Sequence, residues 1–192
     1  EFTDTNATVL DEKKLQASLI DALVFTAIFS SDGEALKTAR RLIRQVAASI
    51  GLVSTSIQTL YEAMGRGEVS GITVPAINIR GLTYEVAQAV FRAAMREKAG
   101  AVLFEIARSE IDYTFQRPAE YATAVTAAAI KAGYRGPLFL QGDHFQISAR
   151  KYAAAANIEI KAVKDLIWEA IGAGFYNIDI DTSTLVDLTK PT

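Results

Sequence analysis

The only histidine of the chain, His144, follows Asp143 and lies just after an apolar run that ends in Gly142. A carboxylate next to an imidazole supplies an acid–base pair and two ligand types for a metal ion. A purely structural interpretation is also open, in which the aspartate caps the next turn and the histidine is hydrogen-bonded in place. The position after an apolar run favours the functional interpretation, because strand ends are where such sites form.

Polar residues follow three other apolar runs in the same way. Asn78 ends the first run, Glu105, Arg108 and Glu110 follow the second, and Asp179, Asp181 and Ser183 follow the fourth. The carboxyl ends of parallel strands meet at one rim, so we expect these side chains near Asp143 and His144. Glu105, Arg108 and Glu110 have two interpretations, a phosphate or metal site and a Glu–Arg ion pair that shapes the rim, and the ion pair is favoured.

The elements that position these residues alternate between strand and helix. Nearly continuous apolar runs predict buried strands at residues 74–79, 101–106, 138–141 and 176–180, and helices are expected to begin near Thr83, Pro118 and Glu159. Trp168 and Tyr176 are expected to pack between helix and sheet. The pattern predicts an α/β fold.

Strand starts recur every 27 to 38 residues or so, and a (β/α)8 barrel uses roughly 30 residues per unit. The four units after Ser70 therefore make either a small open sheet or half of a barrel. Because the chain ends after a strand and its loop, we expect the first half of a barrel, with the second half outside this chain.

Residues 1–69 have a different pattern. Apolar positions recur three and four apart, and the punctuation at residues 30–33 and 65–67 predicts three helices, whereas strand signals are weak. We expect an α-helical segment that precedes the barrel and carries no chemistry.

Composition excludes several classes of protein. The 192 residues include 20 Lys+Arg and 22 Asp+Glu, for a net charge of -2, and no cysteine. We therefore expect no nucleic-acid partner, no disulfide and no cysteine-ligated metal. No apolar stretch is long enough to cross a membrane and no leader opens the chain, so we expect no membrane association and a cytoplasmic location.

Four short motifs, in order, resemble the class II (metal-dependent) ketose-bisphosphate aldolases. They are Val74-Pro75-Ala76-Ile77-Asn78-Ile79, the strand at 101–106, Leu140-Gln141-Gly142-Asp143-His144, and Ile178-Asp179-Ile180-Asp181-Thr182-Ser183. The resemblance runs from Val74 to the end of the chain and implies that residues 70–192 form the first half of a (β/α)8 barrel.

The resemblance also implies a function, the reversible aldol cleavage of a phosphorylated ketose such as fructose 1,6-bisphosphate. His144 would bind the metal, usually Zn²⁺, and Asp143 would transfer the proton of the substrate hydroxyl. Asn78, Asp181 and Ser183 would line the substrate site. A homo-oligomer, dimer or tetramer, is expected.

The chain departs from the family in two places. Gln141 replaces the first histidine of the usual His-x-Asp-His motif, and Ala107 stands where several members have a serine. The three-histidine site would need residues outside this chain. Gln141-Gly142-Asp143-His144 is also similar to the motif of the non-catalytic, chaperone-like subunit of tagatose-bisphosphate aldolase, so an accessory role is the alternative.

Overall fold

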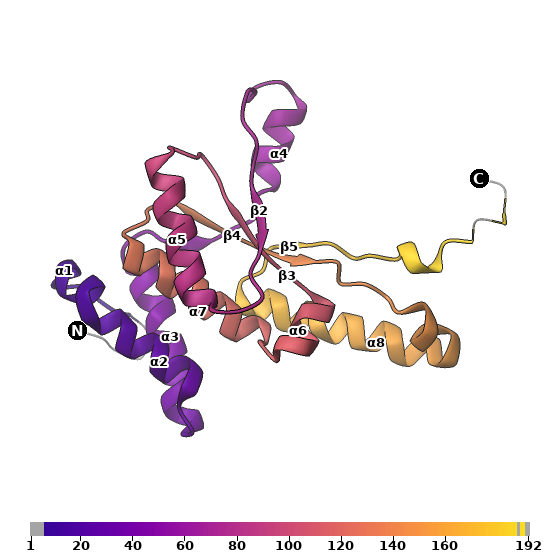
Figure 1. Ribbon diagram of the computed structural model, residues 1–192, viewed down its shortest axis with the longest axis horizontal. Helices are drawn as coiled ribbons and strands as arrows, with labels where there is room; N and C mark the ends of the chain where they lie inside the picture. The colour runs from indigo at the N-terminus through magenta and orange to yellow at the C-terminus, as the bar shows by residue number, and fades with distance from the viewer. Residues whose placement is uncertain (1–5, 188, 191–192) are drawn as a thin grey trace.

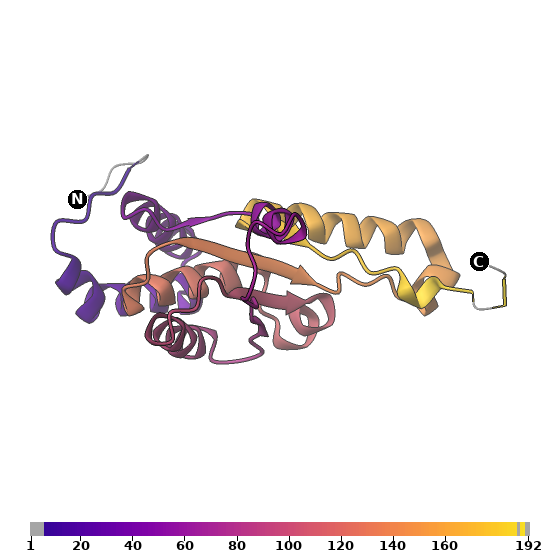
Figure 2. The same cartoon turned by 90° about the horizontal axis from the view of Figure 1, so that it is seen from above.

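The computed structural model describes residues 6–187 and 189–190 (Figure 1). It contains a parallel sheet covered by helices, which confirms the predicted α/β class. Figures 1 and 2 show the N-terminal helices at one end of the long axis and the segment that follows the last strand at the other. The elements, in chain order, are α1 (Glu12–Lys14), a π-helical turn (Leu15–Leu19), α2 (Ile20–Phe29), α3 (Gly33–Ser49), β1 (Val53–Ser54), α4 (Gln58–Gly65), β2 (Ala76–Asn78), α5 (Thr83–Arg96), β3 (Leu103–Ala107), α6 (Arg108–Thr114), α7 (Pro118–Ala132), β4 (Pro137–Asp143), α8 (Ala149–Ala173), β5 (Asn177–Ile178) and a 3-10 turn (Ser183–Leu185).

The four predicted strands are present, and β2, β3, β4 and β5 pair side by side in chain order, all parallel. The sheet gains one strand that the sequence did not predict. β1 pairs in parallel with Pro137 and Leu138 at the start of β4, so residues 1–69 contribute to the sheet and are not helical throughout. Backbone pairing with β4 makes this two-residue strand, which is too short to show a hydrophobic period.

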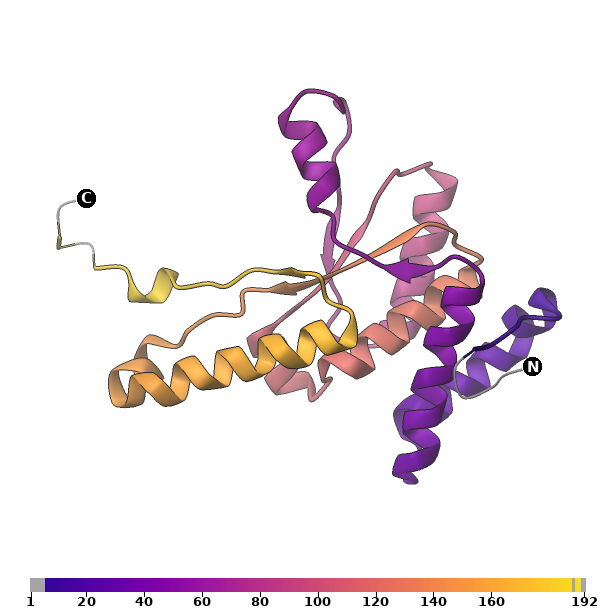
Figure 3. The same ribbon diagram turned by 180° about the vertical axis from the view of Figure 1, so that it is seen from behind.

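The two faces of the sheet differ in chemistry. Phe104, Ile106, Leu138 and Leu140 point to one face and belong to the main hydrophobic core, together with residues of α2, α3, α5, α7 and α8. On the opposite face, the described residues form a small apolar cluster of Leu103 and Phe139 with residues beside and within α4. Figure 3 shows α4 projecting away from the other long helices. Beyond this cluster, the second face carries the polar side chains of the rim.

Helix α7 is the centre of the helical layer. It packs against α2, α3, α5 and α8, and its residues 121–130 are all buried. Tyr121 is fully buried, and its hydroxyl donates a hydrogen bond to the backbone carbonyl of Glu105 (2.7 Å). This hydrogen bond fixes α7 to β3, the strand that carries Glu105.

Three other expectations need correction. Helix α8 begins at Ala149, ten residues before the predicted Glu159, because the hydroxyl of Ser148 accepts from the amide of Lys151 and starts the helix there. A backbone kink at Ala155 interrupts the helical pattern.

The short α6 was not predicted. Trp168 and Tyr176 are 73% and 52% exposed, so the expectation that they pack between helix and sheet is wrong.

Gly142 and Phe145 shape the loop that leads out of β4. The Phe145 ring is fully buried, and a Cβ atom at Gly142 would lie 2.6 Å from its Cζ atom. Only glycine leaves room for the ring directly below the strand end. The ring anchors the loop, and His144 between the two residues adopts a left-handed backbone conformation (φ 44°).

We predict that Gly142→Ala lowers the free energy of unfolding by about 1–3 kcal/mol, because the added methyl group overlaps a ring that cannot leave the core. Thermal and denaturant unfolding would measure this change. Gly172→Ala is the matched control, since nothing lies within 4 Å of its added methyl group and alanine favours the helix. Equal stability of the two variants would show that Phe145 does not depend on the space at Gly142.

Candidate functional site

A row of four polar side chains crosses the open face of the sheet. The strand register aligns Asn78 of β2 with Glu105 of β3, Glu105 with Gln141 of β4, and Gln141 with Asn177 of β5. The Gln141 amide donates to Glu105 Oε1 (2.5 Å), and Asn177 Oδ1 accepts from Ser56 Oγ and from the backbone of Ile57 (3.0 Å each). The four side chains form a polar floor below the rim, in which Gln141 and Glu105 are hydrogen-bonded to each other.

Glu105 is the unusual member of this row. It is 7% exposed, and no lysine or arginine of the described residues forms an ion pair with it. Burial, reinforced by the nearby negative charge of Asp143, raises the pKa of Glu105 to about 7. This carboxyl group therefore exchanges its proton near neutral pH.

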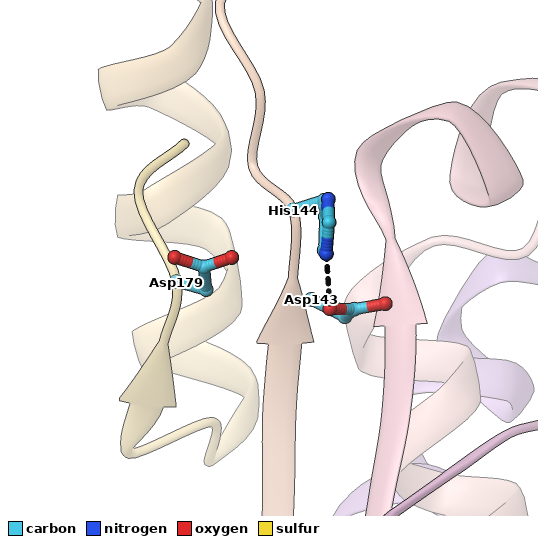
Figure 4. A group of neighbouring side chains, drawn as sticks. All are labelled: Asp143, His144 and Asp179. Atoms are coloured by element: carbon cyan, nitrogen blue, oxygen red, sulfur yellow. Dashed lines mark ion pairs between the residues drawn. The ribbon is translucent and has the colours of Figure 1, made fainter. Parts of the chain in front are cut away.

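Asp143, His144 and Asp179 form the rim above this floor (Figure 4). Asp143 ends β4, His144 follows it, and Asp179 lies just beyond β5. One potential ligand atom from each residue lies within 4.8 Å of those of the other two. Backbone hydrogen bonds hold the two segments together, from Asp179 N to Gly142 O and from Phe145 N to Asp179 O (2.8 Å each). The only imidazole and two carboxylates thus converge from neighbouring strand ends.

Carboxylates lie on both sides of the His144 ring. Nε2 is 3.4 Å from Asp143 Oδ1, and Nδ1 is 3.5 Å from Asp181 Oδ2. The His144 side chain is 62% exposed, whereas those of Asp143 and Asp181 are 22% and 12% exposed. The imidazole therefore reaches solvent while its two carboxylate neighbours are held within the rim.

Asp181 is firmly held. Its Oδ1 accepts from the backbone amide of Ser183 (2.8 Å) and its Oδ2 from the side-chain amide of Gln146 (2.5 Å). Hydrogen bonds from Ser183 and Gln146 lower the pKa of Asp181 to about 2, so it is an anion at all ordinary pH values. Ser183 itself is exposed and contacts Asp181, which places it at the edge of the site.

Asn78 links the site to an ion pair. Its amide donates to Asp143 Oδ2 (2.9 Å) and to Glu110 Oε2 (3.0 Å). Glu110 also pairs with Arg80 and accepts from the amide of Ala107. Burial alone would raise the pKa of Glu110, but these donors hold it below the usual value. The ion pair expected among Glu105, Arg108 and Glu110 is not formed, because Glu110 pairs with Arg80 and Arg108 pairs with Glu159.

A cleft of about 410 Å³ opens beside His144. Asp143 and His144 line it together with Arg108, Ser109, Ser148 and Lys151, and the Asp112 carboxylate lines it too. Cations and hydroxyl groups next to a potential metal site can accommodate a phosphorylated small molecule.

The structure brings together Asn78, Asp143, His144 and Asp181 of the predicted site residues. The sequence places Asp179 and Glu105 at the rim but assigns neither a catalytic or metal-binding role, with Glu105 expected in an ion pair, and it does not single out Gln146. For Asp179 a signal was available, since it stands two residues after Asn177 just as Asp143 stands two residues after Gln141. No sequence signal indicates the environments of Glu105 and Gln146, which arise from strand register and from a loop.

We predict that Glu105→Gln changes how stability depends on pH in the metal-free protein. A carboxyl group whose pKa is raised from 4.5 to about 7 stabilises the fold fully below pH 4.5, and this contribution disappears as pH rises through 7. With a chelator present, wild type should lose about 1–3 kcal/mol relative to Glu105→Gln between pH 5 and pH 8.

Denaturant unfolding at a series of pH values measures the difference, and Glu85→Gln, at an exposed position of α5, is the control. Parallel pH profiles for wild type and Glu105→Gln would contradict the raised pKa.

No helix of the described residues is long and apolar enough to cross a membrane. No known family model, curated protein or solved structure matches the chain. The geometry of the site is therefore the basis on which a function can be proposed for this chain.

Proposed function

We propose that this chain forms the first half of a (β/α)8 barrel whose rim binds a divalent metal ion and cleaves a phosphorylated ketose by a reversible aldol reaction. The convergence of Asp143, His144 and Asp179 within 4.8 Å carries the proposal. The chain-ordered parallel strands β2 to β5 support the barrel, since consecutive strands are neighbours in that fold.

The donor set fits a divalent cation. It offers one imidazole nitrogen and two carboxylates, and catalytic zinc sites commonly use three protein ligands and leave a position open. The 3.4 Å between His144 Nε2 and Asp143 Oδ1 resembles the roughly 3.4 Å between two ligand atoms that each lie about 2.1 Å from a tetrahedral ion. Asp181, beside Nδ1, matches the carboxylate that commonly orients a metal-binding histidine.

Each side chain then has a role in the reaction. His144, Asp179 and Asp143 Oδ1 would hold the ion, which when bound acts as a Lewis acid toward the ketose carbonyl. Asp143 Oδ2, fixed by the Asn78 amide, would accept the proton of the substrate hydroxyl as the carbon–carbon bond breaks. Lys151, Ser109 and Ser148 line the cleft where the phosphorylated substrate would lie.

Zinc binding and aldol cleavage by the full-length gene product test the proposal. We expect Zn²⁺ to bind and fructose or tagatose 1,6-bisphosphate to be cleaved, and His144→Ala to abolish both. Asp179→Asn should weaken zinc binding at least about 10-fold, because one of three donors loses its charge. Asp165→Asn, which alters an exposed carboxylate on α8, is the control and should bind like wild type.

A metal-free, inactive wild type would contradict the proposal. If that protein also co-purifies with an aldolase subunit, the non-catalytic accessory role is the correct interpretation. Gln141 favours the accessory role, because it stands where the aldolases have the first histidine of their motif, and its side chain is hydrogen-bonded to Glu105.

A further inference from the structure

A buried ion pair connects helix α8 to the end of β3. Arg108 follows β3 directly, and Glu159 lies in α8. Arg108 Nη1 is 2.6 Å from Glu159 Oε1, and Nη2 is 3.2 Å from Oε2, so the contact is bidentate. The two side chains are only 14% and 3% exposed. The hydrogen bonds from Arg108 lower the pKa of Glu159, so the pair stays charged.

The same ion pair holds the loop between His144 and α8. Arg108 Nη1 also donates to the backbone carbonyl of Gln146 (2.7 Å), and Glu159 Oε1 accepts from the amide of Ser148 (2.8 Å). Figures 1 and 2 show α8 running alongside this loop and the segment after β5. Two separate points of the loop are therefore held by one bidentate pair.

Gln146 carries the connection on to the rim. Its backbone carbonyl faces Arg108, and its side-chain amide donates to Asp181 Oδ2 (2.5 Å). The same Asp181 oxygen lies 3.5 Å from Nδ1 of His144. A continuous series of polar contacts thus runs from Glu159 through Arg108, Gln146 and Asp181 to the imidazole.

We propose that Arg108, Gln146 and Glu159 are positioning residues that set the orientation of the His144 ring for metal binding. The inference rests on the proposed metal site. Stability alone does not require such a pair, because buried ion pairs can often be replaced by apolar side chains at no cost. The planar guanidinium of Arg108 instead fixes the orientation of the groups that it binds, and a metal-binding histidine needs a fixed ring orientation.

Two variants of the full chain test the proposal. Gln146→Leu removes the amide that holds Asp181 but keeps the carbonyl that Arg108 binds. Glu159→Gln removes the charge of the pair. Glu169→Gln is the matched control, since it alters another bidentate arginine pair of α8, with Arg117, that does not touch the loop. Zn²⁺ titration and melting temperature are measured for each.

We expect Gln146→Leu and Glu159→Gln to raise the Kd for Zn²⁺ at least about 10-fold, while Glu169→Gln binds like wild type. The melting temperature of Gln146→Leu should stay within a few degrees of that of the control. Unchanged zinc affinity in Gln146→Leu would overturn the proposal, whether or not Glu159→Gln folds.

A second readout separates this inference from the proposed function. His144 is the only histidine, so the NMR relaxation of its Cε1–H group reports one ring without assignment ambiguity. In metal-free wild type and Glu169→Gln the ring should be ordered, and in Gln146→Leu it should move as a free side chain. If wild type binds no Zn²⁺, the proposed function fails, and this comparison alone decides whether the positioning role stands.

Discussion

The parallel register of β4 between β3 and β5 determines where the polar side chains on the strands of the site lie. It places Glu105, Gln141 and Asn177 in one row, and two residues further it brings Asp143 and Asp179 to the same rim. A shift of one residue would turn these side chains toward the helical core. The space at Gly142, filled by the Phe145 ring, keeps the strand end and the following loop in that register.

The charge distribution follows from this arrangement. Several carboxylates gather on one face of the sheet, and the protein neutralises them in different ways. Glu110 is paired with Arg80 and Asn78, and Glu105 takes up a proton near neutral pH. Among the described residues, neither Asp143 nor Asp179 forms an ion pair with a lysine or arginine, and both lie beside His144. A bound divalent cation would neutralise the negative charges of Asp143 and Asp179, and it would in turn favour the charged form of Glu105.

Much of this arrangement could be predicted from the sequence. Continuous apolar runs predicted β2 to β5, and the predicted starts of α5 and α7 at Thr83 and Pro118 are confirmed. The rule that strand ends share one rim predicted that Asn78, Asp143, His144 and Asp181 lie together, because it needs only strand order.

The rest depends on interactions that no local pattern shows. β1 exists because β4 offers an unpaired edge, and α8 starts early because Ser148 caps it. Glu105 was interpreted as a rim ion-pair residue, yet its raised pKa comes from burial in the folded sheet and, next, from the negative charge of Asp143 on β4. The Arg108–Glu159 pair joins residues 51 positions apart, and the role of Gln146 depends on where that pair holds the loop.

The most direct test of the account is a crystal structure of the chain grown with Zn²⁺, with anomalous diffraction measured on both sides of the zinc absorption edge. The account predicts an anomalous peak in contact with His144 Nε2 and with carboxylate oxygens of Asp143 and Asp179. A zinc ion bound elsewhere would contradict this prediction. So would a His144 ring that, at saturating Zn²⁺, contacts Asp143 and Asp181 but no zinc ion.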